Sequence, residues 1–259
     1  MKVNVARRAV SAWFALLLRS IVELYPRGIA MLWLAPLVLA LAVVPEFLQH
    51  VAEIQLGMFD NRESARAVAG DPLRWAFGYA KLAGLVLTFL AAARFWWARK
   101  HKQLWWDVRT IDWGRFLLGL LLFGALPLLA ELLEPVAGTT AKDVASWLLT
   151  VVALPFALLM LAGLFGDRRP TLRQMWTRGW PALLILCILI PLAFVPAQIL
   201  HGYNHGWAFG AHPFLVWVLM IFDSLVVGLL AGLTGTALYL GYAAFARDRA
   251  GIAARLALR

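Results

Sequence analysis

The chain has 259 residues, of which 63% are hydrophobic and 15% are charged, and its mean hydropathy is +0.77. Soluble domains carry about 25% charged residues, and a soluble domain could not keep so large an apolar excess away from water. The hydropathy also excludes a disordered chain, and the single cysteine, Cys187, excludes a disulfide scaffold and a four-cysteine metal centre. The composition therefore predicts a polytopic membrane protein with a formal net charge of +10.

The first expected element is an amphipathic helix over residues 11–25. Its apolar side chains recur at helical spacing, but Arg19 and Glu23 interrupt them and the segment is too short to cross a bilayer. It is therefore predicted to lie flat in the cytoplasmic interface. Arg7 and Arg8 are also compatible with a secretory signal, which is disfavoured because Arg19 breaks the apolar core that such a signal needs.

Six apolar runs follow, each long enough to cross a hydrocarbon core of ~30 Å as a helix. They cover residues 28–47, 75–97, 116–133, 145–165, 181–200 and 214–245. The short-range alternation of a transmembrane β-barrel is absent from the sequence, so an all-α fold is predicted. The expected organisation is a tail with an interfacial helix over residues 1–27, a transmembrane domain over 28–246 and a basic tail over 247–259.

The charged residues between these runs form two alternating groups. Nineteen of the 24 Lys and Arg residues, with five acids, lie in residues 1–27, 94–115, 167–180 and 247–259. Four Lys and Arg residues, with eight acids, lie in residues 46–74, 131–143 and 201–213. Because cytoplasmic segments carry the positive excess, we predict six spans with both termini in the cytoplasm of a bacterial-type inner membrane. The basic face is expected to meet anionic lipid and no nucleic acid.

The sequence contains a weak internal repeat. Residues 27–50 and 178–201 share Arg-Gly, Ala-x-Val-Pro and a final His at an offset of 151 residues, and residues 82–99 and 230–247 match at an offset of 148. Such matches also arise by coincidence where Leu, Ala and Gly are common. A genuine repeat would predict pseudosymmetric helical hairpins of the kind found in many transporters.

Two predicted spans carry small residues four positions apart. The two ladders are Ala80, Gly84, Thr88 and Ala92, and Ser224, Gly228, Gly232 and Thr236. Small residues at this spacing let helix backbones approach closely. Since both spans are predicted to run from outside to inside, we expect them to pack side by side along the ladders. A homodimer or another membrane-protein partner on these surfaces is the alternative.

Lys81 and Asp223 are the two ionisable residues deep inside predicted spans. Burying either without a partner costs at least ~2.5–3.5 kcal/mol. They lie nine and ten residues after Pro72 and Pro213, which places them at similar depth, so an ion pair between them is predicted. The alternatives are a proton or substrate site, and Lys81 extended outward to the interface.

Histidines gather near the outer ends of the predicted spans. They are His50, His201, His205 and His212. Two histidines four residues apart on a helix can share a metal ion, but Gly202 and Gly206 favour a loop over residues 200–214. An interfacial turn with no metal and no cofactor is therefore expected, with a metal site made from these histidines as the alternative.

Catalytic signals are sparse. Glu131 and Glu134 could form an acid–base pair at the outer end of the third span, but they are also explained as charges that flank an apolar run. The sequence has no G-x-S-x-G, H-E-x-x-H or P-loop motif. An enzyme is therefore less favoured than a non-enzymatic protein.

The function favoured by these features is a transport or permease component with an intramembrane cavity near the outer leaflet. The six spans, the repeat, the intramembrane charges and the prolines that kink the spans all favour it. One alternative is a non-catalytic envelope scaffold or accessory subunit that binds lipid or another membrane protein. Another is a membrane-embedded lipid-modifying enzyme that uses the outer-face histidines.

Overall fold

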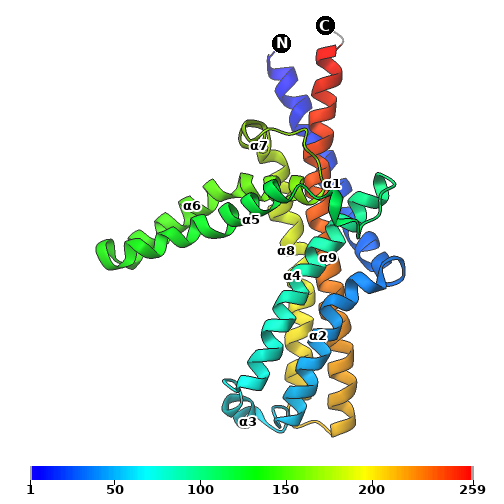
Figure 1. Ribbon diagram of the computed structural model, residues 1–259, viewed down its shortest axis with the longest axis vertical. Coiled ribbons are helices and arrows are strands. Elements are labelled where there is room, and N and C mark those ends of the chain that lie inside the picture. Colours follow the sequence, from blue (N-terminus) through cyan, green and yellow to red (C-terminus); the bar gives the residue numbers. More distant parts are fainter. Residues whose placement is uncertain (1, 258–259) are drawn as a thin grey trace. The chain divides into compact units, whose positions relative to one another are not determined.

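The computed structural model describes the backbone of residues 2–257 and the side chains of residues 10–132 and 138–247 (Figure 1). Within this part of the chain every regular element is a helix, and six helices are long and apolar enough to cross a membrane. The chain is therefore an all-α, multi-pass membrane protein, as predicted. The cytoplasmic location of both termini stays a prediction.

The spanning helices account for most of the chain. They are α2 (Pro36–Gln55), α4 (Pro72–Lys100), α5 (Trp113–Leu128) with the 3-10 turn η2 (Leu129–Leu133), α6 (Glu134–Leu164), α8 (Trp180–Ala208) and α9 (Pro213–Ala257). The remaining elements are α1 (Lys2–Leu34), α3 (Arg62–Ala67), the 3-10 turn η1 (Val108–Thr110) and α7 (Leu172–Arg178). The side chains of Arg7, Arg8 and the tail beyond residue 247 lie outside the described residues.

The first spanning helix begins later than predicted. Residues 28–34 belong to α1, and the chain leaves the helical conformation at Ala35 (φ −148°, ψ 53°) before α2 starts. Pro36 explains the break, because a proline ring disfavours the helical conformation in the residue before it. The helix predicted over residues 11–25 is part of α1; its place in the interface stays a prediction.

The chain divides into two compact units. Unit 1 contains Met1–Leu18, Trp97–Cys187 and Leu238–Arg259, and unit 2 contains Arg19–Trp96 and Ile188–Ala237. α1, α4, α8 and α9 each contribute one part to each unit. Every residue of the polar cluster that forms the candidate site belongs to unit 2.

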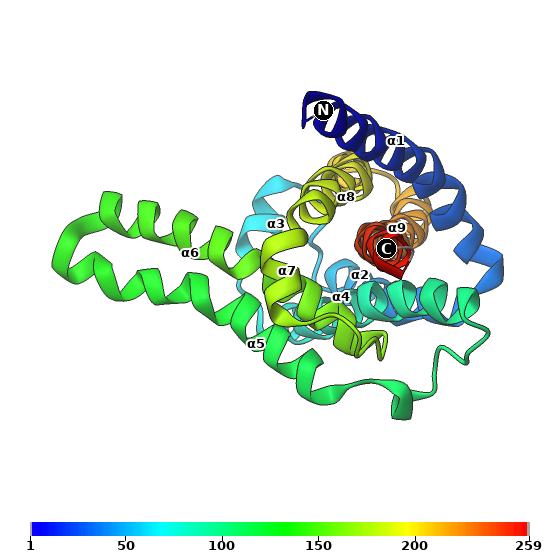
Figure 2. The ribbon, with the colours of Figure 1, turned by 90° about the horizontal axis from the view of Figure 1, so that it is seen from above.

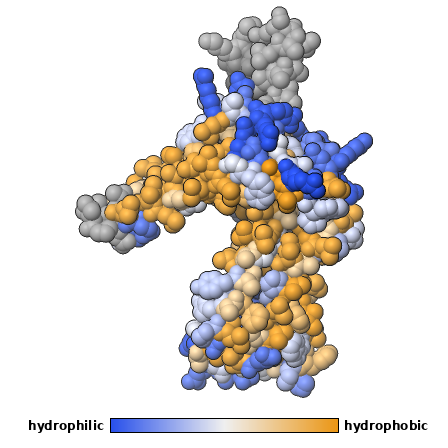
Figure 3. Space-filling model, viewed as in Figure 1, coloured by the Kyte–Doolittle hydropathy of each residue, from blue (hydrophilic) through white to orange (hydrophobic). Residues whose placement is uncertain are grey.

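Unit 1 contains the hairpin of α5 and α6, which lie side by side in both views (Figures 1 and 2). A methyl group on Gly119 would collide with the backbone of Met160, and one on Gly163 with the backbone of Phe116, so the two glycines allow this close approach. Many apolar side chains of the hairpin are exposed (Figure 3), as expected of helices that face lipid.

A buried carboxylate links α9 to the loop after α6 in unit 1. The Tyr242 hydroxyl donates a hydrogen bond of 3.0 Å to Asp167, and Arg169 Nε donates one of 2.8 Å. This second bond raises the pKa of Arg169 above its ordinary value. The Trp97 ring stacks on Phe165 with 4.8 Å between centroids, and the Tyr242 ring meets both edge-on.

In unit 2 both small-residue ladders face α2. A methyl group on Gly84 of α4 would collide with the carbonyl oxygen of Leu41, and methyl groups on Gly228 and Gly232 of α9 would collide with side chains of α2. The two ladders therefore pack mainly against α2, and the predicted packing of α4 on α9 is present at one end, where a methyl group on Gly235 of α9 would collide with Ala92 of α4. At the same end, Trp96 Nε1 donates a 3.0 Å hydrogen bond to Thr236.

Candidate functional site

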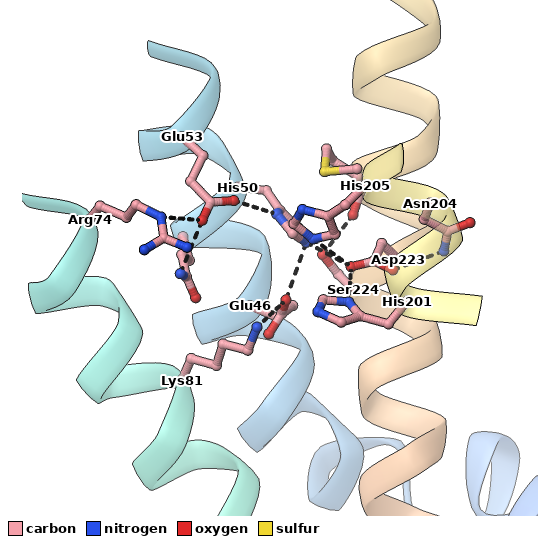
Figure 4. A network of polar contacts seen from close by, with 12 residues as sticks. Glu46, His50, Glu53, Arg74, Lys81, His201, Asn204, His205, Asp223 and Ser224 are labelled. Atoms are coloured by element: carbon pink, nitrogen blue, oxygen red, sulfur yellow. Dashed lines mark hydrogen bonds and ion pairs between the residues drawn. The ribbon is translucent and has the colours of Figure 1, made fainter. Parts of the chain in front are cut away.

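Polar side chains of unit 2 form one cluster between helices that are candidate spans (Figure 4). The cluster consists of Glu46, His50 and Glu53 of α2, Arg74 and Lys81 of α4, His201, Asn204 and His205 of α8, and Asp223 and Ser224 of α9. Half of these residues are no more than 1% exposed. Ionisable groups buried in spanning helices are costly and commonly mark a functional site.

Three residues of the cluster lie on one face of α2. Glu46, His50 and Glu53 are four and three residues apart, a spacing that places side chains on the same side of a helix. His50 Nε2 lies 3.2 Å from Glu46 Oε1, and His50 Nδ1 lies 3.1 Å from Glu53 Oε2. The predicted span ended at residue 47, which placed Glu53 in an outer segment, so this arrangement was not predicted from the sequence. The spacing within an amphipathic helical pattern is the signal that could have revealed it.

Asp223 is the centre of the cluster. Its Oδ2 lies 2.6 Å from His201 Nδ1, 3.1 Å from His50 Nε2 and 3.5 Å from His205 Nε2. Its Oδ1 accepts a 2.8 Å hydrogen bond from Asn204 Nδ2. One oxygen of a fully buried carboxylate is thus surrounded by imidazole nitrogens from α2 and α8.

The surroundings of His50 require one positive charge. A neutral imidazole has one N–H and one lone pair, yet both nitrogens of His50 face carboxylate oxygens, Nδ1 toward Glu53 and Nε2 toward Glu46 and Asp223. A lone pair directed at a buried carboxylate is repelled by it. The site is therefore built to hold a cation, either as a second ring proton or as a bound ion.

The basic residues of α4 contact the carboxylates of α2. Lys81 Nζ lies 2.8 Å from Glu46 Oε1, and Arg74 Nε lies 3.0 Å from Glu53 Oε1. The predicted Lys81–Asp223 pair is not the arrangement in the structure. Lys81 is three residues before Gly84, on the helix face that packs against α2, and it therefore reaches Glu46 instead.

α8 brings two histidines together on one helix face. The loop predicted over residues 200–214 is helical as far as Ala208, so His201 and His205 are one turn apart with 4.6 Å between ring centroids. Gly202 and Gly206 do not end the helix, and a methyl group on either would contact nothing within 4 Å. The prediction of a loop here was wrong.

The repeat aligned His50 with His201, and both contact the same oxygen of Asp223. Each also follows a proline of its own helix by five residues, Pro45 in α2 and Pro196 in α8. The two matching segments of sequence therefore supply matching side chains to the cluster.

Several atoms of the cluster, and one of the adjacent Gln49 on α2, lack a hydrogen-bond partner among the described residues. They are Glu46 Oε2, Gln49 Oε1, Asn204 Oδ1 and His205 Nε2, all of them buried. His205 Nε2 lies within ion-pair distance of Asp223 without the geometry of a hydrogen bond. Leaving a buried polar atom unpaired costs ~1–3 kcal/mol, so these atoms are expected to bind water or a ligand.

A pocket of about 330 Å³ lies next to the cluster, between the α2–α3 turn and the α8–α9 turn. Its lining includes Phe59, Asp60 and Trp217. The Phe59 ring packs on the ring of His205 with 5.7 Å between centroids and is only 4% exposed. Phe59 therefore contacts both the pocket and the histidines.

Other residues considered in the sequence analysis lie outside the cluster. His212 accepts a 3.3 Å hydrogen bond from the backbone N–H of Phe214 at the start of α9. Glu131 is exposed and lies 3.9 Å from Lys142. The side chain of Glu134 is outside the described residues, so an acid–base pair of Glu131 and Glu134 is not tested.

Comparisons of the chain with protein-family models, with curated proteins and with solved structures give no match. No relative therefore indicates what this chain does, and its function is inferred from the chain's own residues.

Proposed function

We propose that the protein is a transport component of a bacterial-type inner membrane and that it moves a cation by way of the buried cluster around Asp223. The observation that carries this proposal is the convergence of His50, His201 and His205 on one oxygen of a fully buried aspartate, from helices that are candidate spans. Ionisable groups placed in this way are typical of ion pathways and relays.

The charges of the cluster favour a cation. Glu46, Glu53 and Asp223 carry three negative charges, and Lys81 and Arg74 supply two positive ones. With neutral imidazoles the cluster is therefore one negative charge in excess. A buried net charge is costly, so the cluster attracts one further positive charge.

The pocket at Phe59 supplies an approach to the cluster. It lies between the turns at Asp60 and Gly210, and Phe59, one of its lining residues, packs its ring on the ring of His205. Prolines inside α2 and α8 weaken both helices close to the histidines, since a proline removes a backbone hydrogen bond. A small movement at these positions would connect the pocket with the cluster.

The charge pattern of the sequence orients this proposal in the membrane. The positive-inside bias places both termini in the cytoplasm, where the basic segments meet anionic lipid. The cluster then lies toward the outer leaflet, near the α8–α9 turn. A scaffold role is less favoured, because Gly84, Gly228 and Gly232 pack inside unit 2 and are not free for another membrane protein.

A membrane-embedded lipid-modifying enzyme is the second candidate. The observation that favours it is the contact of 3.1 Å between His50 and Glu53, a pair of the kind that acts as a general base. An enzyme of this class would change the lipids of the bilayer around it. Transport of a cation would leave them unchanged.

The test is flux through the purified full-length chain in liposomes of phosphatidylethanolamine and phosphatidylglycerol. Entry of H⁺, K⁺, Mn²⁺ and Zn²⁺ is followed separately with trapped fluorescent indicators, for the wild type, D223N and the control E63Q in exposed α3. We expect flux of at least one cation and a loss of about tenfold or more in D223N only. Absence of all four fluxes, or equal flux in D223N, would overturn the proposal, and Asp223-dependent lipid products would favour the enzyme.

A further inference from the structure

We propose that Glu46, His201, His205 and Asp223 form a binding site for one divalent transition-metal ion of the zinc class. This inference deepens the proposed function and rests on it only for the role of the ion, because binding at the site can be measured without transport. One ligand atom from each residue lies within 4.8 Å of those from the other three.

The spacing of the ligand atoms matches a small tetrahedral site. Zinc bonds of ~2.0–2.1 Å to nitrogen and oxygen separate neighbouring ligand atoms by ~3.3 Å. Asp223 Oδ2 lies 2.6 Å from His201 Nδ1 and 3.5 Å from His205 Nε2. The pair of Asp223 and His205 is therefore within about 0.2 Å of this separation, and the pair of Asp223 and His201 would have to move apart by about 0.7 Å.

The donor set suits a divalent transition metal. Imidazole nitrogen together with carboxylate oxygen is typical of zinc and its neighbours, whereas magnesium and calcium prefer oxygen ligands alone. Glu46 and Asp223 bring two negative charges to the ion, and because Lys81 remains beside Glu46, binding of a divalent ion changes the net charge of the cluster from one negative to one positive. His201 and His205 are also separated by four residues on a helix, the spacing by which paired histidines reach one metal ion.

Each carboxylate of the site has one oxygen occupied by a neighbouring side chain. Lys81 Nζ contacts Glu46 Oε1 at 2.8 Å, and Asn204 Nδ2 donates to Asp223 Oδ1 at 2.8 Å. Neighbours of this kind orient metal ligands and hold them in place. The second oxygen of Glu46 has no hydrogen-bond partner among the described residues, and the second oxygen of Asp223 is the one on which the histidines converge, so that an ion there would replace its contact with His201.

Atoms without hydrogen-bond partners point to a ligand independently. Glu46 Oε2 and His205 Nε2 are buried and have no hydrogen-bond partner among the described residues. Glu46 itself is fully buried, so its oxygen has no access to bulk water. A metal ion would satisfy both atoms at once.

The experiment measures metal bound to the full-length chain, purified in mild detergent with a tag that contains no histidine. The protein is stripped with EDTA and dialysed against ZnCl₂, and bound zinc is counted by mass spectrometry. We expect about one zinc ion per chain in the wild type. We expect at least about tenfold weaker binding in H205A and D223N. H212A is the control, because His212 lies outside the cluster. This variant should bind zinc as the wild type does.

If the variants fail to fold, two measurements on the wild type alone still test the site. Addition of CoCl₂ to the stripped protein should give the visible absorption bands of a tetrahedral cobalt site. Zinc should also protect His201 and His205, but not His212, from modification by diethylpyrocarbonate. No bands and no protection, wild-type binding far below one ion per chain, or equal binding in the folded variants would each overturn the metal site.

The two proposals fail in different ways. Stoichiometric, Asp223-dependent zinc binding without flux of any cation supports the metal site and overturns transport. Flux of H⁺ or K⁺ that depends on Asp223, without zinc or cobalt binding, supports transport and overturns the metal site.

Discussion

Tyr25 donates its hydroxyl hydrogen to the carbonyl oxygen of Leu192 across 2.7 Å. In a regular helix this carbonyl would accept a hydrogen bond from the N–H of residue 196, but residue 196 is proline and has none. A side chain of α1 therefore replaces the backbone donor that α8 lacks. This contact stabilises α8 nine residues before it reaches His201.

Replacing Tyr25 by phenylalanine should destabilise the protein. The Y25F substitution leaves a carbonyl group without a donor in an apolar environment, at a cost of ~1–3 kcal/mol. The apparent melting temperature in mild detergent should fall accordingly. Y203F is a matched control, because Tyr203 of the same helix α8 is 58% exposed. Equal melting temperatures for Y25F and the wild type would contradict the assigned role of this hydrogen bond.

Lys81 and Glu46 should behave as a coupled pair. K81M leaves a buried carboxylate without its partner, and breaking a buried ion pair in this way costs ~3–5 kcal/mol. K81M/E46Q removes both charges, so it should recover much of the loss. The free energies of unfolding are compared by denaturant titration, with R62M in exposed α3 as a control. The pairing would be refuted if K81M/E46Q were no more stable than the summed effects of K81M and E46Q predict.

Gly84 should tolerate no larger residue. A methyl group at this position would collide with the carbonyl oxygen of Leu41 in α2, so G84A forces α4 away from α2. Overpacking of this kind costs ~1–3 kcal/mol. In G78A of the same helix the nearest atom to the methyl group is 3.8 Å away, and there a better helix former should be neutral or stabilising. Melting temperatures test the contrast, and equal effects of G84A and G78A would exclude the close contact.

Glu23 of α1 should contribute a small part of the free energy of unfolding at neutral pH, and this part should be lost in acid. Burial by itself would raise the pKa of Glu23, but a hydrogen bond from Arg19 and the charge of Arg27 outweigh it and lower the pKa below its ordinary value. The contribution is therefore fully present above the ordinary pKa and is lost as the pH falls through the lowered one.

The measurement is the melting temperature of the wild type and E23Q between pH 7 and pH 3. We expect the wild type to be more stable at pH 7, by no more than ~1 kcal/mol for partly exposed ion pairs. The difference should close as the solution becomes acidic. A difference that stays constant over this range would show that Glu23 acts by packing and not by charge.

Hydropathy and helical periodicity were sufficient to predict the membrane class, the six spans and the all-α fold. The predicted runs over residues 75–97 and 181–200 lie within α4 and α8. The error at a helix end that bears on the site was at residues 201–208, where two glycines and two histidines were interpreted as a loop. Apolar packing of Ala208 in unit 2 keeps that stretch helical, and local propensity is overridden there.

Several residues of the candidate site were predicted from the sequence, but the contacts between them were not. Lys81, Asp223, His50, His201 and His205 were all identified, yet Lys81 was assigned to Asp223, and His201 and His205 were assigned to an interfacial turn. Glu46 and Glu53 were missed as site residues, because their charges were attributed to an outer segment. Pairing depends on which helix faces meet, and this information lies outside any single helix.

Chain composition, the lengths of the apolar runs and the alternation of charge determine that this protein crosses a membrane, because transfer to lipid depends on each segment separately. The close approach of α2 at Gly84 and Gly228, the extension of α8 to Ala208 and the grouping of three histidines on Asp223 were decided by tertiary packing. Packing sets how each helix is rotated about its axis, and that rotation determines which buried charges become neighbours.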